Sequence, residues 1–234
     1  MPILFYLENT RVKIFYDIGG IMNLNNVFKK VYMWMFIGLL LTFATGYFVS
    51  INENMAYKVY NLYWVLAIIE IILVIVLSAR IGKMNITTSR IMFLTYSFVS
   101  GLTFSSVFIA YDMRSIIIVF LISSLLFLIF AILGYITKLD LTSVGTFLLM
   151  ALIGIVICSI INIFVGNGTF EIVICSISIL IFLGFTAYDV NKIKQLQDIY
   201  PDEDSLAIVG ALELYLDFIN IFLDLLRIVA NNRD

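Results

Sequence analysis

The stretch that decides the fold is residues 206–230, LAIVGALELYLDFINIFLDLLRIVA. It has the length and apolar content of a membrane-spanning helix. Its polar residues recur at spacings of four, three, four and three, which places them on one helical face. Insertion of each charged side chain at the bilayer centre costs about 2.5–3.5 kcal/mol. The favourable insertion free energies of the apolar residues add up to a sum comparable with this total cost. The segment is therefore stable only when other helices surround this face, which carries Glu213, Asp217, Asn220, Asp224 and Arg227.

The rest of the chain supplies those surrounding helices. Of its 234 residues, 62% are hydrophobic and 13% are charged, about half the charge of a soluble domain. Six further apolar stretches are each long enough to cross a hydrocarbon core about 30 Å thick. We therefore predict an all-α, polytopic membrane protein with seven transmembrane helices in one domain, residues 22–234. The six stretches are residues 27–49, 62–81, 89–111, 115–137, 143–165 and 169–188.

Residues 1–21 differ from the rest of the chain. They carry four charged residues and have no uninterrupted apolar core, so they are not a signal peptide. Met22 stands directly before a normal entry into the first span. We predict that residues 1–21 are a non-native or disordered N-terminal extension and that Met22 is the natural start.

The basic residues predict the orientation of the chain in the membrane. With a cytoplasmic N-terminus, ten of the 14 Lys and Arg residues fall on the inner side, as the positive-inside rule requires. Lys29 and Lys30 stand on the inner flank of the first span, which often dominates. We therefore predict a multi-pass protein of the cell (plasma) membrane whose main partner is the lipid bilayer. The net charge of −2 gives no indication that the protein binds nucleic acid.

The sequence contains no histidine and two cysteines. Without histidine, Ser-His and Cys-His nucleophiles and the usual zinc sites are excluded. Cys158 and Cys175 lie within predicted spans, where small packing residues are expected. We therefore expect no enzymatic activity and no cofactor. Any pH response near neutrality must come from interacting or desolvated carboxyl groups.

The acidic residues of the spans form a series across the predicted membrane. Asp189 stands at the inner boundary of the sixth span, and Asp217 lies about 16 Å into the last helix. Glu70 lies about 12 Å from the outer end of the second span. A buried set of carboxylates suits a route for protons or cations, and oxygen ligands suit hard cations such as Ca²⁺. The other acids of the series are Glu213, beside Asp217, and Asp224, near the outer face.

Each of these residues also has a simpler interpretation. Asp189 could be an ordinary solvated charge at a helix end, and Glu70 could be a packing acid that burial keeps protonated. Glu213 and Asp224 could merely extend the polar, hydrated face of the last helix. Arg227 is expected to reach the membrane interface or to pair with Asp224 rather than to take part in chemistry.

Four stretches resemble the Bax inhibitor-1 (transmembrane Bax inhibitor motif) family, in its bacterial branch. The most specific are ALELYLDFINIFLDLLRIV at residues 211–229 and AYDVNKIK at residues 187–194. FKKVYMWMFIGLLLTF at residues 28–43 and the segment 134–164 also agree with it. The resemblance covers nearly everything from residue 27 to residue 229.

The resemblance implies a fold of seven helices with the last one central, and a pH-sensitive Ca²⁺ leak. By this resemblance Asp189 and Asp217 are the pH sensor, and Glu70 matches a glutamate of the family's second span. Together with the series of acids, it makes Asp189, Asp217 and Glu70 weak ligands of passing Ca²⁺, and the series itself places Glu213 and Asp224 further along the ion pathway. The family's basic partner matches Arg80 after a small shift of register, and Arg227 is a second possible basic partner. Glu213 departs from the family, whose members commonly have a small residue there.

Two other classes of protein remain as alternatives. A non-conducting membrane protein could use the polar face to bind a partner or to regulate a stress response. An intramembrane aspartyl protease would need a YD and a GxGD motif; Tyr188-Asp189 supplies the first, but the sequence contains no GxGD. Ion flux into liposomes that contain only this protein would discriminate between conduction and these alternatives.

Overall fold

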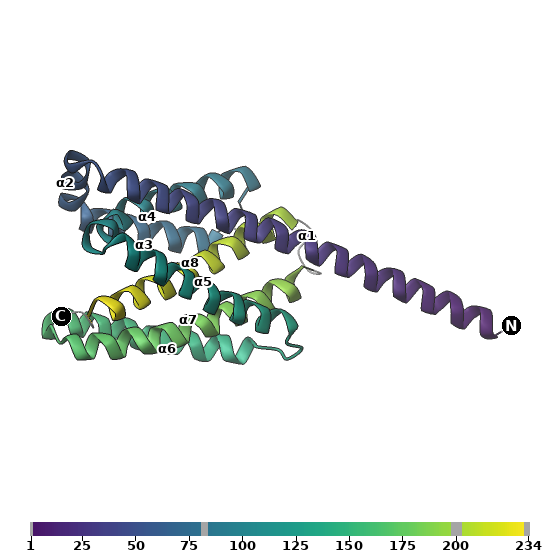
Figure 1. The fold of residues 1–234 in the computed structure, drawn as a ribbon. Helices are drawn as coiled ribbons and strands as arrows, with labels where there is room; N and C mark the ends of the chain where they lie inside the picture. Colours follow the sequence, from purple (N-terminus) through teal and green to yellow (C-terminus); the bar gives the residue numbers. More distant parts are fainter. Residues whose placement is uncertain (1, 81–83, 198–202, 232–234) are drawn as a thin grey trace.

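The computed structural model describes residues 2–80, 84–197 and 203–231, and its regular secondary structure in these ranges is entirely α-helical. Figure 1 shows the helices as a bundle from which the N-terminal part of α1 runs outward. The helices are α1 Pro2–Ser50, α2 Glu53–Asn61, α3 Tyr63–Arg80, α4 Ile86–Ala110, α5 Met113–Ile136, α6 Thr142–Val165, α7 Gly168–Leu196 and α8 Glu203–Asn231.

The predicted number of spans agrees with these helices. Within the described residues, six helices are long and apolar enough to cross a membrane, and the bent pair α2 and α3 makes up to seven. The second predicted span, residues 62–81, corresponds to α3, whose 18 residues cover about 27 Å. The short helix α2 precedes it at an angle of 69°. The chain is therefore an all-helical, polytopic membrane protein.

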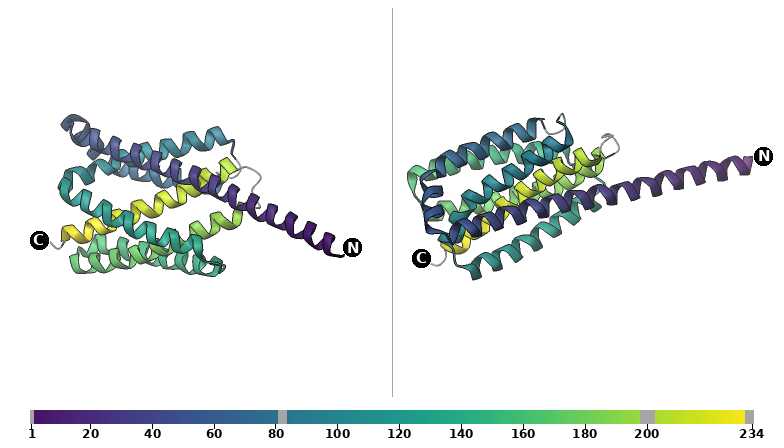
Figure 2. Two further views of the ribbon diagram at one scale, coloured as in Figure 1. Left: turned by 45° about the vertical axis from the view of Figure 1, so that its right-hand side comes forward. Right: turned by 90° about the horizontal axis from the view of Figure 1, so that it is seen from above.

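Helix α1 is longer than the first predicted span. Its membrane-spanning part is Asn26–Ser50, and the helix begins at Pro2. The backbone before Asn26 continues the same helix away from the bundle (Figure 2). The prediction that residues 1–21 are a non-native or disordered extension stays a prediction.

Helix α8 occupies the centre of the bundle, as the family resemblance implied. It contacts α1, α4, α5 and α7, whereas α6 packs chiefly on α7. Of the α8 span, 72% is buried, against 6% of the α6 span. Helices α1–α4 lie on one side of α8 and α5–α7 on the other (Figures 1 and 2). Within the described residues, the two sides touch one another directly at only a few points, so α8 joins two half-bundles.

An aromatic layer holds the middle of α8. The Phe222 ring lies 5.7 Å from Phe43 of α1 and 5.6 Å from Phe104 of α4, centroid to centroid. The Tyr215 hydroxyl is 2.7 Å from Oγ1 of Thr42, which itself donates to a backbone carbonyl of α4. Because this buried hydroxyl is satisfied, the polar atom carries no desolvation penalty. The apolar face of α8 is thereby fixed against the first half-bundle.

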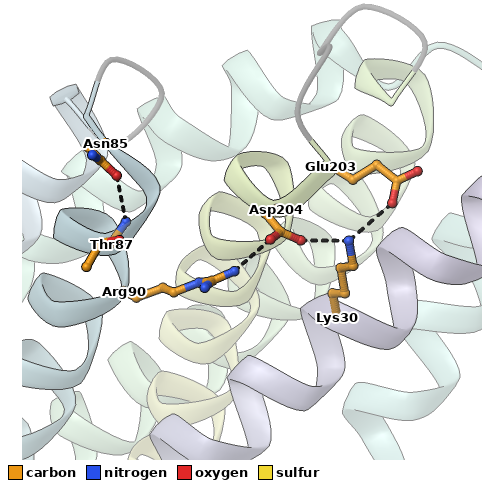
Figure 3. A network of polar contacts seen from close by, with 6 residues as sticks. All are labelled: Lys30, Asn85, Thr87, Arg90, Glu203 and Asp204. Atoms are coloured by element: carbon orange, nitrogen blue, oxygen red, sulfur yellow. Dashed lines mark hydrogen bonds and ion pairs between the residues drawn. The ribbon is translucent and has the colours of Figure 1, made fainter.

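An ion-pair network, which we call the α8 clamp, fixes the first turn of α8 (Figure 3). Asp204 lies 2.6 Å from Lys30 of α1 and 2.6 Å from Arg90 of α4. Glu203 adds a longer contact of 3.2 Å to Lys30. Acidic residues are also favourable at a helix N-terminus. The clamp therefore ties the start of α8 to α1 and α4, both in the first half-bundle.

Candidate functional site

Asp189 lies inside helix α7, where the sequence had predicted the end of a span. The sixth predicted span stops at residue 188, but α7 continues to Leu196, about two further turns. Asp189 consequently faces the bundle and is only 6% exposed. The simpler interpretation of Asp189 as a solvated charge at a helix end is therefore wrong.

Asp189 and Asp217 form a buried carboxyl pair. Helices α7 and α8 run antiparallel and in close contact, which brings the two side chains within hydrogen-bond reach. Asp217 is 4% exposed and also contacts Thr186, one turn before Asp189. Two carboxyl groups can share a hydrogen bond only when one of them carries a proton. The arrangement is therefore suited to a pair that holds a shared proton.

Lys192 and Glu213 form an ion pair beside the carboxyl pair. Lys192 Nζ lies 2.6 Å from Oε1 of Glu213, and both side chains are partly exposed. We call Asp189, Lys192, Glu213 and Asp217 the acidic cluster. It contains three carboxyl groups and one ammonium group, so it has an excess of negative charge unless it binds protons or cations. The position of Lys192 three residues after Asp189 places both on one helical face, but the sequence alone did not reveal that Lys192 pairs with Glu213.

Two oxygens of the acidic cluster are free to accept a further ligand. Among the residues that the structure describes, Oδ2 of Asp217 and Oε2 of Glu213 are buried and have no hydrogen-bond partner. A buried acceptor without a partner is costly, so each oxygen favours a proton, a cation or water as a partner. The cluster is thus suited to the binding of protons or hard cations.

Glu70 lies in a different place, on the other side of α8. Its Oε1 is 2.6 Å from the hydroxyl oxygen of Thr103 on α4. Both residues line a cavity of about 380 Å³ between α3, α4 and α8, whose wall includes Tyr96 and Asn220. The structure therefore places Glu70 in a polar cavity but not in the acidic cluster.

Asp224 and Arg227 form a second polar centre near the C-terminal end of α8. Arg227 NH1 lies 3.0 Å from Oδ1 of Asp224, so the expected pairing of these two residues is confirmed. Cys175 and Ser178 of α7 also lie near the Asp224 carboxylate. A cavity of about 530 Å³ between α6, α7 and α8 opens beside them. The polar face of α8 is thus divided among several neighbours.

No group of three or more His, Cys, Asp or Glu side chains that could hold a metal ion occurs in the described ranges. The prediction that Asp189, Asp217 and Glu70 act as weak Ca²⁺ ligands stays a prediction. The Arg80 side chain lies outside the described residues, so its role as a basic partner also stays a prediction.

The comparisons with known proteins agree with these observations. A family model described as "Inhibitor of apoptosis-promoting Bax1" matches residues 24–234. The chain is 39% identical to an inner membrane protein, YbhL, of Escherichia coli K12, over 90% of this chain and 93% of that protein. It is 37% identical to an uncharacterised membrane protein of Streptococcus pyogenes serotype M1, over 92% and 95% of the two chains. A protein of Borreliella burgdorferi is 36% identical over 90% and 94%.

Proposed function

Because this chain belongs to the Bax inhibitor-1 family of membrane proteins, we propose that it is a pH-sensitive calcium leak channel gated by Asp189 and Asp217. The observation that carries the proposal is the buried carboxyl pair between α7 and α8. The pair titrates as one unit, since two adjacent carboxyl groups in a site of low dielectric constant cannot both be charged without strong repulsion.

Loss of the shared proton is the opening step of the proposed channel. It leaves two like charges in contact, and at short range in a poorly solvated site this repulsion amounts to several kcal/mol. The helices must then separate or admit a cation. Since the α8 clamp ties α8 to α1 and α4, helix α7 is the element that moves.

The ion path proposed here runs from the acidic cluster along α8. The two free oxygens, on Glu213 and Asp217, offer the first binding positions. Glu70 offers a further carboxylate in the cavity between α3, α4 and α8, and Asp224 offers another nearer the C-terminal end of α8. Few oxygens are available at each position, against the six to eight that Ca²⁺ prefers, so binding is weak and passage is a slow leak.

The proposal also concerns the location of the protein. Its likeness to an inner membrane protein supports a multi-pass protein of the bacterial inner, or cytoplasmic, membrane. We propose a cytoplasmic N-terminus on the basis of the basic residues on the inner flanks. The acidic cluster would then lie nearer the cytoplasm and the Asp224–Arg227 pair nearer the outside.

The test is Ca²⁺ flux into liposomes that contain only the purified protein, at several pH values between about 5 and 8. We expect slow uptake above that of empty liposomes, and a rate that changes with pH. A variant with both Asp189→Asn and Asp217→Asn should retain a flux that does not respond to pH. Absence of flux at every pH would reject the channel function.

One observation also fits a protease. Two adjacent aspartic carboxyl groups that share a proton are the arrangement used by aspartyl proteases. The sequence has no GxGD motif around Asp217, which lies in YLDF, and we therefore propose a non-enzymatic role. Cleavage of a transmembrane peptide by the purified protein, abolished by Asp217→Asn, would favour the protease. Absence of both flux and cleavage would favour a non-conducting interaction or stress-regulatory protein.

A further inference from the structure

The Lys192–Glu213 ion pair lies directly beside the buried carboxyl pair. On α8, Glu213 precedes Asp217 by one helical turn and shares its face. On α7, Lys192 follows Asp189 by one turn in the same way. The contact of 2.6 Å between the ammonium and carboxylate groups therefore joins the same two helices as the carboxyl pair does.

Both members of the ion pair act electrostatically on the carboxyl pair. Glu213 interacts with Asp189 and with Asp217, and Lys192 interacts with Asp189. Oε2 of Glu213 is buried and has no hydrogen-bond partner among the described residues, so Lys192 binds only one side of this carboxylate. The ring of Tyr188 lies 5.9 Å from Nζ of Lys192. A negative charge nearby hinders the loss of a proton from a carboxyl group, and a positive charge favours it.

Other helices pack on α7 and α8, but their charged groups are engaged or distant. Lys30 of α1 and Arg90 of α4 belong to the α8 clamp, about 13 Å along α8 from Glu213. Helix α6 has no charged residue, and Arg114 stands at the far end of α5. Within the described residues, the ion pair is therefore the main source of charge beside the carboxyl pair.

We propose that the Lys192–Glu213 ion pair sets the pH at which the channel responds. Glu213 retains the shared proton of the carboxyl pair, and Lys192 promotes its loss. The inference rests on the proposed channel function and names the residues that regulate its pH sensor. Both residues act through the carboxyl pair, so they are positioning residues. Their opposing effects largely cancel in the wild type, and removal of either charge uncovers the effect of the other.

The first measurement is the midpoint of the pH dependence of Ca²⁺ flux into liposomes. Glu213→Gln should lower this midpoint by roughly one pH unit, because the carboxyl pair then loses its proton more readily. Lys192→Gln should raise it by a similar amount. The double variant lacks both charges and should return close to the wild-type midpoint.

An ion pair that only ties α7 to α8 would give a different pattern. Either single variant would then break the same bond and favour opening, so both midpoints would fall, and that of the double variant would fall with them. Lys192→Gln therefore separates the two roles. Lys192→Arg retains the charge and should stay near the wild-type midpoint.

Lys194→Gln is the matched control. It removes a cation from the same end of α7, but residues two apart on a helix do not face each other. The Lys194 ammonium donates to the backbone carbonyl of Tyr135 on α5. This variant should leave the midpoint of flux unchanged.

A single variant leaves one charge of the ion pair without its partner, which can impair folding. Monodisperse elution in detergent identifies the variants that have folded. The double variant avoids the unpaired charge and is still decisive by itself. A midpoint near that of the wild type supports the proposal, and a clear fall in the midpoint overturns it.

The second measurement follows the proton itself and does not depend on Ca²⁺ passage. Protonated carboxyl groups absorb infrared light at a frequency where carboxylates do not. Spectra of the protein in lipid nanodiscs, recorded between about pH 5 and 8, should contain a carboxyl band that Asp217→Asn removes. The midpoint of this band should fall in Glu213→Gln and rise in Lys192→Gln.

The two measurements separate failure of this proposal from failure of the channel. Opposite shifts of the infrared midpoint without Ca²⁺ flux in any protein would reject the channel and retain the role of the ion pair. Flux with the wild-type midpoint in both single variants would overturn the role of the ion pair and retain the channel. Shifts in the same direction, or the absence of a band that depends on Asp217, would also overturn it.

Discussion

Each acid on the polar face of α8 has its own neighbour. Glu213 has Lys192 of α7, and Asp224 has Arg227, one turn further along α8. Asp217 lies against another acid, Asp189, and we propose that a proton rather than a cationic partner stabilises it. Because a lone charge at this depth costs about 2.5–3.5 kcal/mol, we propose that the shared proton is the part of the site that responds to pH.

Replacement of either aspartate should flatten the pH dependence of flux. Asp189→Asn and Asp217→Asn each remove the like-charge repulsion that follows loss of the proton, since an amide cannot ionise. The double variant should add little to either single one, because residues in direct contact are not independent. Flux measured at half-unit pH steps would show the flattened dependence. If both single variants keep the wild-type pH profile, other residues sense the pH.

Asp140→Asn is the matched control for these variants. Asp140 is exposed in the connection between α5 and α6 and accepts hydrogen bonds from Thr142. These bonds hold the pKa of Asp140 below its usual value. It is therefore ionised throughout the tested range, and its replacement should leave the pH profile of flux intact.

Glu70→Gln should lower Ca²⁺ flux several-fold and leave the protein folded. The amide retains the shape of the acid and can still bond to the Thr103 hydroxyl, but it cannot attract a cation. The measurement is flux together with the midpoint of thermal unfolding in detergent. Equal flux in variant and wild type would show that Glu70 is only a packing acid of the α3–α4 cavity.

The sequence predicted that the polar residues of α8 share one helical face, but it did not predict which neighbour each of them contacts. A spacing of three and four places Glu213, Asp217 and Asp224 on one face, and all three contact α7 as expected for a single face. The bond of Lys192 to Glu213 depends on the register between α7 and α8, which hydrophobic patterning does not specify. The separation of Glu70 from the acidic cluster depends on helix packing in the same way.

At the scale of the helices, the apolar runs predicted which segments form helices, but they predicted the ends of these helices less well. The sixth predicted span stopped at residue 188 because polar residues begin there, yet α7 continues to Leu196. The extension is stabilised by contacts that the linear sequence does not reveal. Asn191 Nδ2 lies 3.4 Å from the Gly134 carbonyl oxygen of α5, and Lys194 donates to the carbonyl of Tyr135.

Gly134 sets how closely α5 approaches α7, and its replacement should be destabilising. A Cβ at position 134 would clash with the backbone of Ala187, which cannot move aside as a flexible side chain would. We expect Gly134→Ala to lower stability by about 1–3 kcal/mol. Gly154→Ala on α6, where nothing lies within 4 Å, should be neutral or stabilising by up to about 1 kcal/mol. Thermal unfolding in detergent compares them, and equal midpoints would contradict the close approach.

At the scale of the whole molecule, composition and hydropathy predicted a membrane bundle, and the family resemblance implied that its last helix is central. They did not predict that the bundle divides into α1–α4 and α5–α7. That division depends on which lipid-facing helices meet, and apolar residues face both lipid and protein in this chain. The result is that α8 provides most of the contact between the half-bundles.

Removal of α8 should separate the half-bundles. The Phe43 ring lies 5.4 Å from Phe120 of the other half-bundle and 4.9 Å from Phe104 of its own. In a chain that ends at residue 197 and lacks the native thiols, a cysteine pair at 43 and 104 should still cross-link. A pair at 43 and 120 should cross-link only in the full chain. Cross-linking of both pairs in the shortened chain would contradict the joining role of α8.

The central position of α8 also has a consequence for biosynthesis. Helices α1–α7 are all synthesised before residues 203–231, since synthesis proceeds from the N-terminus. The helix that supplies half of the acidic cluster is therefore the last to arrive, and it must insert between helices that are already in place. The ion route that we propose is therefore incomplete until α8 has been synthesised and inserted.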